Sequence, residues 1–332
     1  MAIWTSSSTA ICVRAFRDKQ NTMERVLVHT VSEEEYRASE NHSLRRFLSV
    51  DLHLSRHSIS RLKFSDSLFI NDQPAHVSMN VKPGDQICII LERDAAASTD
   101  ENRKNSDGLA EKRKIRELIR YEDEDLLIVN KPAGMPVHAS HGHLDDSLGT
   151  LLQKEYQEEG SDFTVRAIGR LDKDVSGLVL FAKNRFAAQI LWEEKETGKL
   201  SKTYLAIAEG TFEHKEGVID LPLQKVTGQR RRVTDEEGKP SFTRYCVLRS
   251  NGNLSLLEVQ IDTGRTHQIR SHLSAIGHPL VGDDLYGGSI SKIKRPALHC
   301  STIRAVQPFT ENTIVIKEDI PEDMQRLLTS EE

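Results

Sequence analysis

The sequence predicts an α+β protein with a mixed, largely antiparallel sheet, preceded by a small α/β module. Several strand-like stretches follow one another without long helices between them, which favours such a sheet. The run 178–182 is continuously apolar and is bounded by Gly177 and Lys183-Asn184, as is typical of a strand buried on both faces. The 332 residues are enough for two domains, each with a core of its own.

Composition describes an ordinary globular protein, with 37% hydrophobic and 29% charged residues. No apolar run is long enough to span a membrane. The net charge of -5 does not indicate nucleic-acid binding, so any such function requires a local cluster of bases. The four cysteines are far apart, without a C-x-x-C pair, and residues 1–22 lack a secretory signal pattern. We therefore expect a cytoplasmic protein with reduced thiols.

Composition changes along the chain predict the domain boundaries. Residues 93–114 have mixed charge, many Ser and Asn residues and no apolar periodicity, which indicates a flexible linker. We therefore expect an N-terminal extension at 1–40, a small module at 41–92, and a large domain at 115–332.

The small module is predicted to contain two helices followed by short strands. Asn41 or Ser43 can cap the first helix, and the second begins near Ser55. The expected strands are 68–70 and 86–91, with a turn at 71–74.

Bases predominate over acids on these two helices. Within residues 45–63 the single acid is Asp51, and the bases are Arg45, Arg46, Arg56, Arg61 and Lys63. Such a patch suits contacts with RNA phosphates, whereas a solvated amphipathic face would not explain the excess of one sign. With the Asn71-Asp72-Gln73-Pro74 turn and Lys82-Pro83-Gly84-Asp85, this stretch resembles the small RNA-binding module first described in ribosomal protein S-four.

The large domain is predicted to begin with a buried strand at 125–130, which Lys131-Pro132-Ala133-Gly134 ends. Further expected elements are a helix at 147–156, a helix capped by Asn184, strands at 202–208 and 254–261, a helix from Thr266 to Ile276, and closing strands at 296–306 and 313–316.

Residues 138–143 contain three histidines but no acid or cysteine at the spacing of metal ligands. We interpret this stretch as a loop lining a polar cleft and expect no metal site. The sequence also contains no cofactor-binding motif.

Three segments place polar residues beside predicted core elements. They are Arg170-Leu171-Asp172, Lys202-Thr203-Tyr204, and the stretch from Thr263 to His272. Asp172 is expected on the loop that leads into the buried strand, where a rigid scaffold can hold a carboxylate against a substrate. The alternative is a surface aspartate paired with its basic neighbours.

Together these segments resemble the signature motifs of the RluA-type RNA pseudouridine synthases. Lys131-Pro132-Ala133-Gly134 and Gly277-His278-Pro279-Leu280-Val281-Gly282-Asp283 also match, in the expected order. The resemblance implies the pseudouridine synthase fold, with Asp172 as the catalytic carboxylate, Arg270 as its partner and Tyr204 in the uracil pocket. It further suggests that Arg170, Arg265, His267 and Gln268 bind the substrate. Gly169 and Val175 depart from the family pattern, which bears on substrate positioning.

The chemistry gives independent reasons for these residue types. Uridine isomerisation needs a carboxylate that acts as nucleophile or base, and it needs no cofactor. A bidentate arginine such as Arg270 would keep a buried Asp172 ionised and oriented. Tyr204 offers a face for the flipped base. A predicted hairpin loop carrying Arg230, Arg231 and Arg232 either grips the RNA backbone or is a solvated tip.

The leading hypothesis is therefore an RNA pseudouridine synthase with Asp172 as its catalytic carboxylate. The resemblance favours large-subunit ribosomal RNA as its target, with tRNA as the alternative. A non-catalytic RNA-binding protein on the same scaffold is the second hypothesis, and a methyltransferase is disfavoured because no glycine-rich cofactor loop follows a strand. We expect the protein to be a monomer that binds RNA and does not associate with a membrane.

Overall fold

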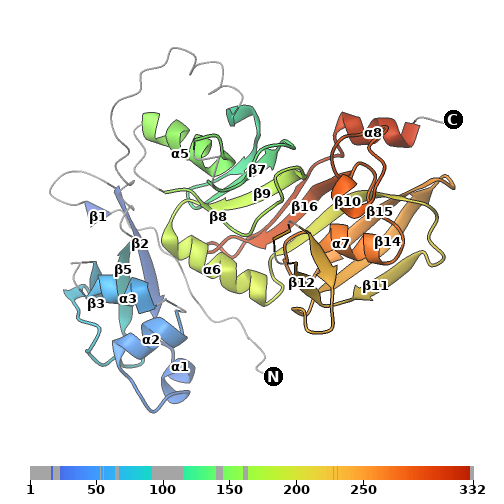
Figure 1. Cartoon of the computed structure of the whole chain (residues 1–332). Helices are drawn as coiled ribbons and strands as arrows, with labels where there is room; N and C mark the ends of the chain where they lie inside the picture. The colour runs from blue at the N-terminus through green and yellow to red at the C-terminus, as the bar shows by residue number, and fades with distance from the viewer. Residues whose placement is uncertain are drawn as a thin grey trace. The chain divides into compact units, whose positions relative to one another are not determined.

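The protein, described by a computed structural model, divides into two compact units, Met1–Ala95 and Ala96–Glu332. The described residues are 16–17, 23–52, 54, 56–63, 67–91, 115–139, 145–159, 164–226, 228–229 and 231–329. Each unit contains its own sheet (Figure 1). The predicted α+β class is confirmed. The linker predicted at 93–114 lies outside the described residues.

The small unit is a five-stranded sheet in the order β1-β2-β5-β3-β4 with three short helices. Its strands are β1 (Phe16–Arg17), β2 (Met23–Thr30), β3 (Leu68–Ile70), β4 (Gln73–Pro74) and β5 (Gln86–Leu91). Its helices are α1 (Glu33–Arg37), α2 (Leu44–Val50) and α3 (Arg56–Leu62). The two predicted helices and the strands at 68–70 and 86–91 are confirmed.

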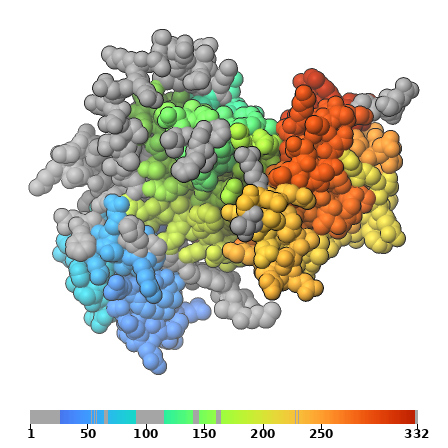
Figure 2. Space-filling model, in the orientation of Figure 1, coloured from blue at the N-terminus to red at the C-terminus, as the bar shows by residue number. Residues whose placement is uncertain are grey.

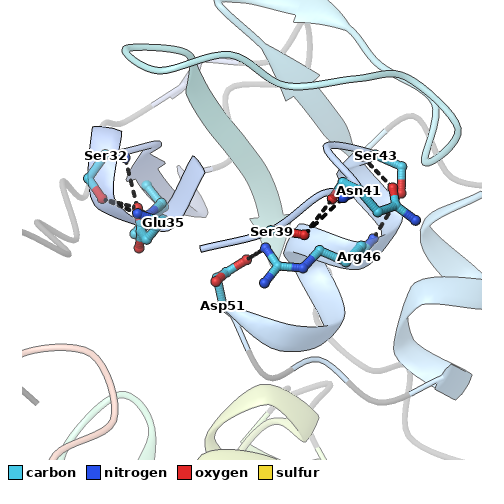
Figure 3. Close-up of polar contacts among 8 residues, drawn as sticks. Ser32, Glu35, Ser39, Asn41, Ser43, Arg46 and Asp51 are labelled. Carbon is cyan, nitrogen blue, oxygen red and sulfur yellow. Dashed lines mark hydrogen bonds and ion pairs between the residues drawn. The ribbon is translucent and has the colours of Figure 1, made fainter. Parts of the chain in front are cut away.

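The small unit begins earlier than the predicted boundary at residue 41. Strand β2 pairs with β5 from Arg25 to Thr30, and α1 follows it directly. The α1 helix starts with a capping box, in which Ser32 Oγ accepts from Glu35 N at 3.1 Å and the Glu35 carboxylate accepts from Ser32 N at 2.7 Å (Figure 3). The described part of the predicted N-terminal extension therefore contributes two strands and a helix to the small unit.

The large unit contains a ten-stranded sheet whose main path is β11-β14-β15-β10-β16-β9-β7-β6. Its strands are β6 (Ile119–Glu122), β7 (Leu126–Lys131), β8 (Arg166–Ala167), β9 (Ser176–Ala182), β10 (Ser201–Glu209), β11 (Glu216–Asp220), β14 (Phe242–Ser250), β15 (Leu254–Ile261), β16 (Leu298–Val306) and β17 (Thr313–Lys317). A separate hairpin pairs β12 (Leu223–Lys225) with β13 (Arg232–Thr234). The pairing of β9 with β16 is parallel, and the other pairs are antiparallel.

The helical elements of the large unit are α5 (Leu148–Glu158), α6 (Arg185–Glu196), α7 (Gln268–Ala275), α8 (Glu322–Thr329) and the 3-10 helix η1 (Asp284–Tyr286). Ser147 and Asn184 cap α5 and α6, because their side-chain oxygens accept from Thr150 N and Ala187 N. Helix α6 packs against β9 and β16, and α7 packs against β13 and β14 (Figure 1). None of the helices among the described residues has the length and apolar character needed to cross a membrane.

One row of paired residues crosses the middle of the large sheet. Lys131 pairs with Gly177, Gly177 with Cys300, and Cys300 with Tyr204. Gly177 has φ +115°, and a Cβ there would lie 2.4 Å from the backbone N and O of Cys300. Only glycine therefore permits β9 to approach β16 so closely.

Strand β9 forms the centre of the core, as its apolar sequence predicts. All seven residues from Ser176 to Ala182 are buried. The preceding loop, which carries Asp172, is thereby attached to a fully buried strand.

The C-terminal residues cover one part of the large sheet. Met324 and Leu327 of α8 join Ile207 of β10 and Val281 in a buried cluster. Figure 2 shows this C-terminal segment, in red, as part of the surface of the large unit. The predicted closing strands are present as β16 and β17.

Helix α7 begins later than predicted. We expected a helix from Thr266, but the regular helix starts at Gln268, because His267 has φ 57° and lies in the left-handed region. This non-helical residue turns the chain at the helix start.

We predict that Gly177→Ala lowers the free energy of unfolding of the large unit by more than about 3 kcal/mol, because the new methyl group would overlap the backbone of Cys300. The matched control is Gly198→Ala, which also has positive φ but no atom within 4 Å. It should cost only about 1–2 kcal/mol of backbone strain. Urea unfolding of both variants measures the difference, and equal losses would contradict the proposed close approach.

Candidate active site

A pocket in the large unit brings together the three polar segments singled out in the sequence. It is lined by all seven residues predicted to have catalytic or substrate-binding roles, namely Arg170, Asp172, Tyr204, Arg265, His267, Gln268 and Arg270. The apolar part of the pocket wall is formed by Leu171, Val175, Ile269 and Leu298. The pocket therefore combines one carboxylate, an aromatic ring and several bases in a partly apolar cavity.

The pairing of three strands places Asp172 beside Tyr204. Asp172 precedes Gly177 by five residues, and Gly177 is joined to Tyr204 through Cys300 in the row described above. The loop closes with a hydrogen bond from Val175 N to Asp172 O at 3.1 Å. The Asp172 side chain is 15% exposed, so its carboxylate reaches the pocket from a mostly buried position.

The Tyr204 ring is buried, and the phenol keeps its proton. Burial raises the pKa of Tyr204 well above its ordinary value, and the neighbouring Cys300 and Asp172 act in the same direction. The residue thus presents a neutral ring to the pocket.

Arg270 contacts two carboxylates, and its principal partner is not the one we predicted. Its Nε and Nη2 donate to Asp283 Oδ2 and Oδ1 at 2.6 and 2.8 Å, whereas Nη1 donates to Asp172 Oδ2 at 3.4 Å. The expectation of a bidentate pair with Asp172 is therefore wrong. The Asp283 side chain is 0% exposed, so this buried carboxylate requires the full guanidinium pair.

Burial alone would lower the pKa of Arg270, but the hydrogen bonds and charge of Asp283, together with the charge of Asp172, raise it. Arg270 is therefore a permanent positive charge that Asp283 holds in place. Its remaining nitrogen faces Asp172 and stabilises that carboxylate.

His267 lies near the same carboxylate. Its Nε2 is 3.8 Å from Asp172 Oδ2, and its Nδ1 is 3.2 Å from the hydroxyl of Tyr286. Burial lowers the pKa of His267, although the charge of Asp172 opposes this change. We therefore treat His267 as a mainly neutral imidazole that contacts the wall of the pocket.

Gln268 lines the pocket, but its amide is occupied by the protein. Its Oε1 accepts from Thr263 Oγ1 and Arg265 N, and its Nε2 donates to Phe242 O and Thr243 Oγ1. All four hydrogen-bonding positions of the amide are filled. Gln268 thus ties the loop before α7 to β14 and does not offer its amide to a substrate.

The two remaining predicted residues, Arg170 and Arg265, are exposed at the pocket. Arg265 Nε donates to Pro240 O at 3.4 Å, a long hydrogen bond. Both guanidinium groups are placed where an anionic ligand could reach them.

Tyr286 was not predicted, although it follows the recognised stretch ending at Asp283 by three residues. Its ring lies beneath the guanidinium groups of both Arg270 and Arg231, at 5.2 and 5.5 Å from the ring centroid. Its hydroxyl accepts from Arg232 N at 2.7 Å. Tyr286 therefore links the β12–β13 hairpin to the pocket, while Arg230 lies outside the described residues.

Lys131 is a second residue whose role the sequence did not reveal. Its side chain is fully buried, and Nζ donates to Pro132 O and Lys173 O at 2.8 and 3.0 Å. Gly134 N also donates to Lys173 O. These bonds fasten the loop carrying Asp172 to β7. Burial lowers the pKa of Lys131 to about 7, although the charges of Asp174 and Asp172 oppose this shift.

The bases predicted to bind RNA in the small unit differ in availability. Arg46 Nη1 forms an ion pair with Asp51 Oδ2 at 2.7 Å and is only 21% exposed (Figure 3). Arg45, Arg56 and Arg61 are exposed, and Lys63 is half-buried. Arg46 is therefore the member least able to contact a phosphate.

Most of the histidine-rich stretch at 138–143 lies outside the described residues, which omit 140–144. Within the described part of the chain, no group of three potential ligands is arranged to hold a metal ion. His138 is described, and burial and the charge of Arg170 lower its pKa.

Comparisons with known proteins agree on one family. The model of the RNA pseudouridylate synthase family matches residues 125–275. The uncharacterized RNA pseudouridine synthase YhcT of Bacillus subtilis (strain 168) is 39% identical over 262 residues, covering 78% of this chain and 83% of the relative. Ribosomal large subunit pseudouridine synthase D of Haemophilus influenzae is 30% identical, covering 82% and 87%. The solved structure of human RNA pseudouridylate synthase domain containing 4 has a TM-score of 0.54 at 23% identity, covering 67% and 97%, and shares the fold.

We predict that Asp283→Asn lowers the free energy of unfolding by about 3–5 kcal/mol, because it leaves the buried Arg270 without its compensating charge. Asp323→Asn is a matched control, since Asp323 pairs bidentately with Arg295 at 2.7 and 2.8 Å but is 45% exposed. It should cost about 1 kcal/mol or less. Urea unfolding measures the free energy of unfolding of both variants. Similar decreases would show that burial does not determine how much the ion pair contributes to stability.

We predict that Lys131 makes the stability of the protein rise with pH between about 7 and 10. In this window the folded lysine is mainly neutral and the unfolded lysine is still protonated, so folding releases a proton and is favoured as the pH rises. Lys131 should add about 1.4 kcal/mol per pH unit to the slope of the free energy of unfolding against pH. Lys131→Met should abolish this component in urea unfolding from pH 7 to 9, and the exposed Lys215→Met serves as control. An unchanged slope in Lys131→Met would refute the assignment.

Proposed function

The chain belongs to the RluA-type RNA pseudouridine synthases, which isomerise uridine to pseudouridine in RNA, and we propose that Asp172 is its catalytic carboxylate. The observation that carries the proposal is the position of Asp172, which lines the pocket with Tyr204 and Arg270. Among the described residues that line the pocket, Asp172 alone has a carboxylate. Arg270 Nη1 donates to this carboxylate at 3.4 Å.

The reaction breaks the bond between uracil N1 and the sugar C1′, rotates the base, and joins C5 to C1′. The proton on C5 is lost and N1 gains one, so the reaction is a net isomerisation. A carboxylate can begin it by attacking C1′ or the base, or by removing a sugar proton. Each route requires a carboxylate within reach of the nucleoside, and the contact of Arg270 Nη1 with Asp172 Oδ2 at 3.4 Å helps to hold that carboxylate in place.

Arg270 and Tyr204 have complementary roles in this proposal. Arg270 positions Asp172 while remaining bound to Asp283, so that the catalytic oxygen keeps its orientation when water leaves the pocket. The neutral ring of Tyr204 provides an apolar surface for a uracil that has left its stack. His267 and Arg170 line the same pocket and would contact the nucleotide beside them.

We further propose that the target is ribosomal RNA. The support is similarity to ribosomal large subunit pseudouridine synthases D of Zymomonas mobilis and Haemophilus influenzae, at 35% and 30% identity.

In this proposal the small unit is a separate RNA-binding module, in which the exposed Arg45, Arg56 and Arg61 contact phosphates. Arg231 and Arg232 would contact RNA next to the pocket, because Tyr286 ties their hairpin to it. We also propose that the enzyme acts as a monomer in the cytoplasm.

We predict that Asp172→Asn lowers the rate of pseudouridine formation by at least about 10²–10⁴-fold, because the amide cannot act as base or nucleophile. The control is Asp174→Asn, which removes an exposed carboxylate from the same loop and should keep most of the activity. Pseudouridines are mapped in ribosomal and transfer RNA from a strain lacking the gene, complemented with each variant.

A folded Asp172→Asn protein that restores every missing pseudouridine would contradict the catalytic role. Restoration of sites in transfer RNA alone, by the wild-type protein, would instead overturn the proposed ribosomal target.

A further inference from the structure

Three cationic side chains gather where the two loops of the pocket meet. They come from separate elements: Lys195 from α6, Lys202 from β10, and Arg265 from the loop before α7. A methyl group placed on Gly169 would lie 3.5 Å from the Nζ atoms of both lysines. One placed on Gly264 would lie 3.6 Å from Lys195 Nζ. The ammonium groups therefore flank a space that the two glycines leave open.

The protein supplies these cations with few acceptors. Lys202 Nζ donates to Ile168 O at 3.4 Å, which is a long contact. Lys195 Nζ lies 4.5 Å from the centroid of the exposed Trp192 ring. Among the residues that the structure describes, no carboxylate forms an ion pair with Lys195, Lys202 or Arg265.

The cations also act unfavourably on one another. Burial lowers the pKa of both lysines; the charge of Lys195 lowers that of Lys202 further, and the charge of Arg265 lowers that of Lys195. Glu196, the next residue in the chain, opposes the shift at Lys195. An anion bound in the space between them would relieve this repulsion and accept hydrogen bonds from both ammonium groups.

The cluster adjoins the pocket, since Arg265 and Gly264 belong to the pocket lining and Gly169 precedes the lining residue Arg170. We propose that Lys195, Lys202 and Arg265 form a binding site for a phosphate of the RNA strand next to the flipped uridine. This inference rests on the proposed function and assigns two residues, Lys195 and Lys202, that the catalytic proposal does not use.

The geometry matches what a flipped nucleotide requires. A uridine that turns into the pocket carries its own phosphodiester groups to the rim, and these groups need a fixed cationic partner. Lysines are suited to this role, because a compact ammonium can approach a phosphate from several directions. The site therefore holds the strand without reading its bases, and it would position the sugar over Asp172.

The first experiment uses the full-length protein and an RNA fragment that spans a uridine mapped as its target. We expect Lys195→Gln/Lys202→Gln to raise KM by about tenfold or more, because charge-assisted contacts are lost, while kcat changes less than about threefold. The slope of log affinity against log salt should become shallower by about 0.7–0.9, corresponding to one phosphate. Lys215→Gln removes one exposed charge elsewhere and is the control.

The second experiment separates phosphate binding from a structural role. Phosphates around the target uridine are replaced one at a time by neutral methylphosphonates, and RNA binding is measured by fluorescence anisotropy. One replacement should lower the RNA affinity of the wild-type protein by about tenfold. The same replacement should change the RNA affinity of the double variant little further, since both changes remove the same contact.

If every methylphosphonate replacement lowered the RNA affinity of the wild type and of the double variant equally, this inference would be overturned and the proposed function would stay intact. An unchanged KM and salt slope in an active double variant would overturn it as well. If wild-type protein formed no pseudouridine in any RNA, the proposed function would fail first, and this inference with it.

Discussion

The parallel pairing of β9 with β16 is the constraint on which the large unit depends. Gly177 faces the backbone of Cys300 so closely that no side chain fits between them. Because Cys300 also pairs with Tyr204, this single approach joins the β6-β7-β9 side of the sheet to the β10-β15-β14-β11 side. It also places the loop carrying Asp172 beside the strand carrying Tyr204. The pocket is therefore a consequence of how the two parts of the sheet meet.

Charge is arranged around this junction so that one carboxylate remains available. Arg270 is held by the fully buried Asp283 through two short hydrogen bonds, and it makes one longer contact with Asp172. Lys131 fastens the other side of the same loop through backbone carbonyl groups. The base that contacts Asp172 is thus bound mainly to another carboxylate, and Asp172 itself lines the pocket.

Local features of the fold were predictable because they depend on neighbouring residues. Ser43 and Asn184 cap their helices as expected, and the apolar run after Gly177 forms a buried strand. The start of α7 was predicted two residues too early, because the left-handed backbone of His267 keeps the residues before Gln268 out of the regular helix, and the residue types there do not reveal this conformation. The pairing of β2 with β5 is likewise a long-range interaction, so the small unit was predicted to begin too late.

The sequence alone determined which residue types meet in the candidate site, since Asp172, Tyr204 and Arg270 lie in recognisable segments with the chemistry that uridine isomerisation needs. The tertiary structure decided how they are used. It gave Arg270 a stronger partner in Asp283, filled the amide of Gln268 with internal hydrogen bonds, and gathered Lys195 and Lys202 near Arg265. The physical reason is that a hydrogen bond or an ion pair depends on distances between residues far apart in the chain, which a linear pattern of residue types does not contain.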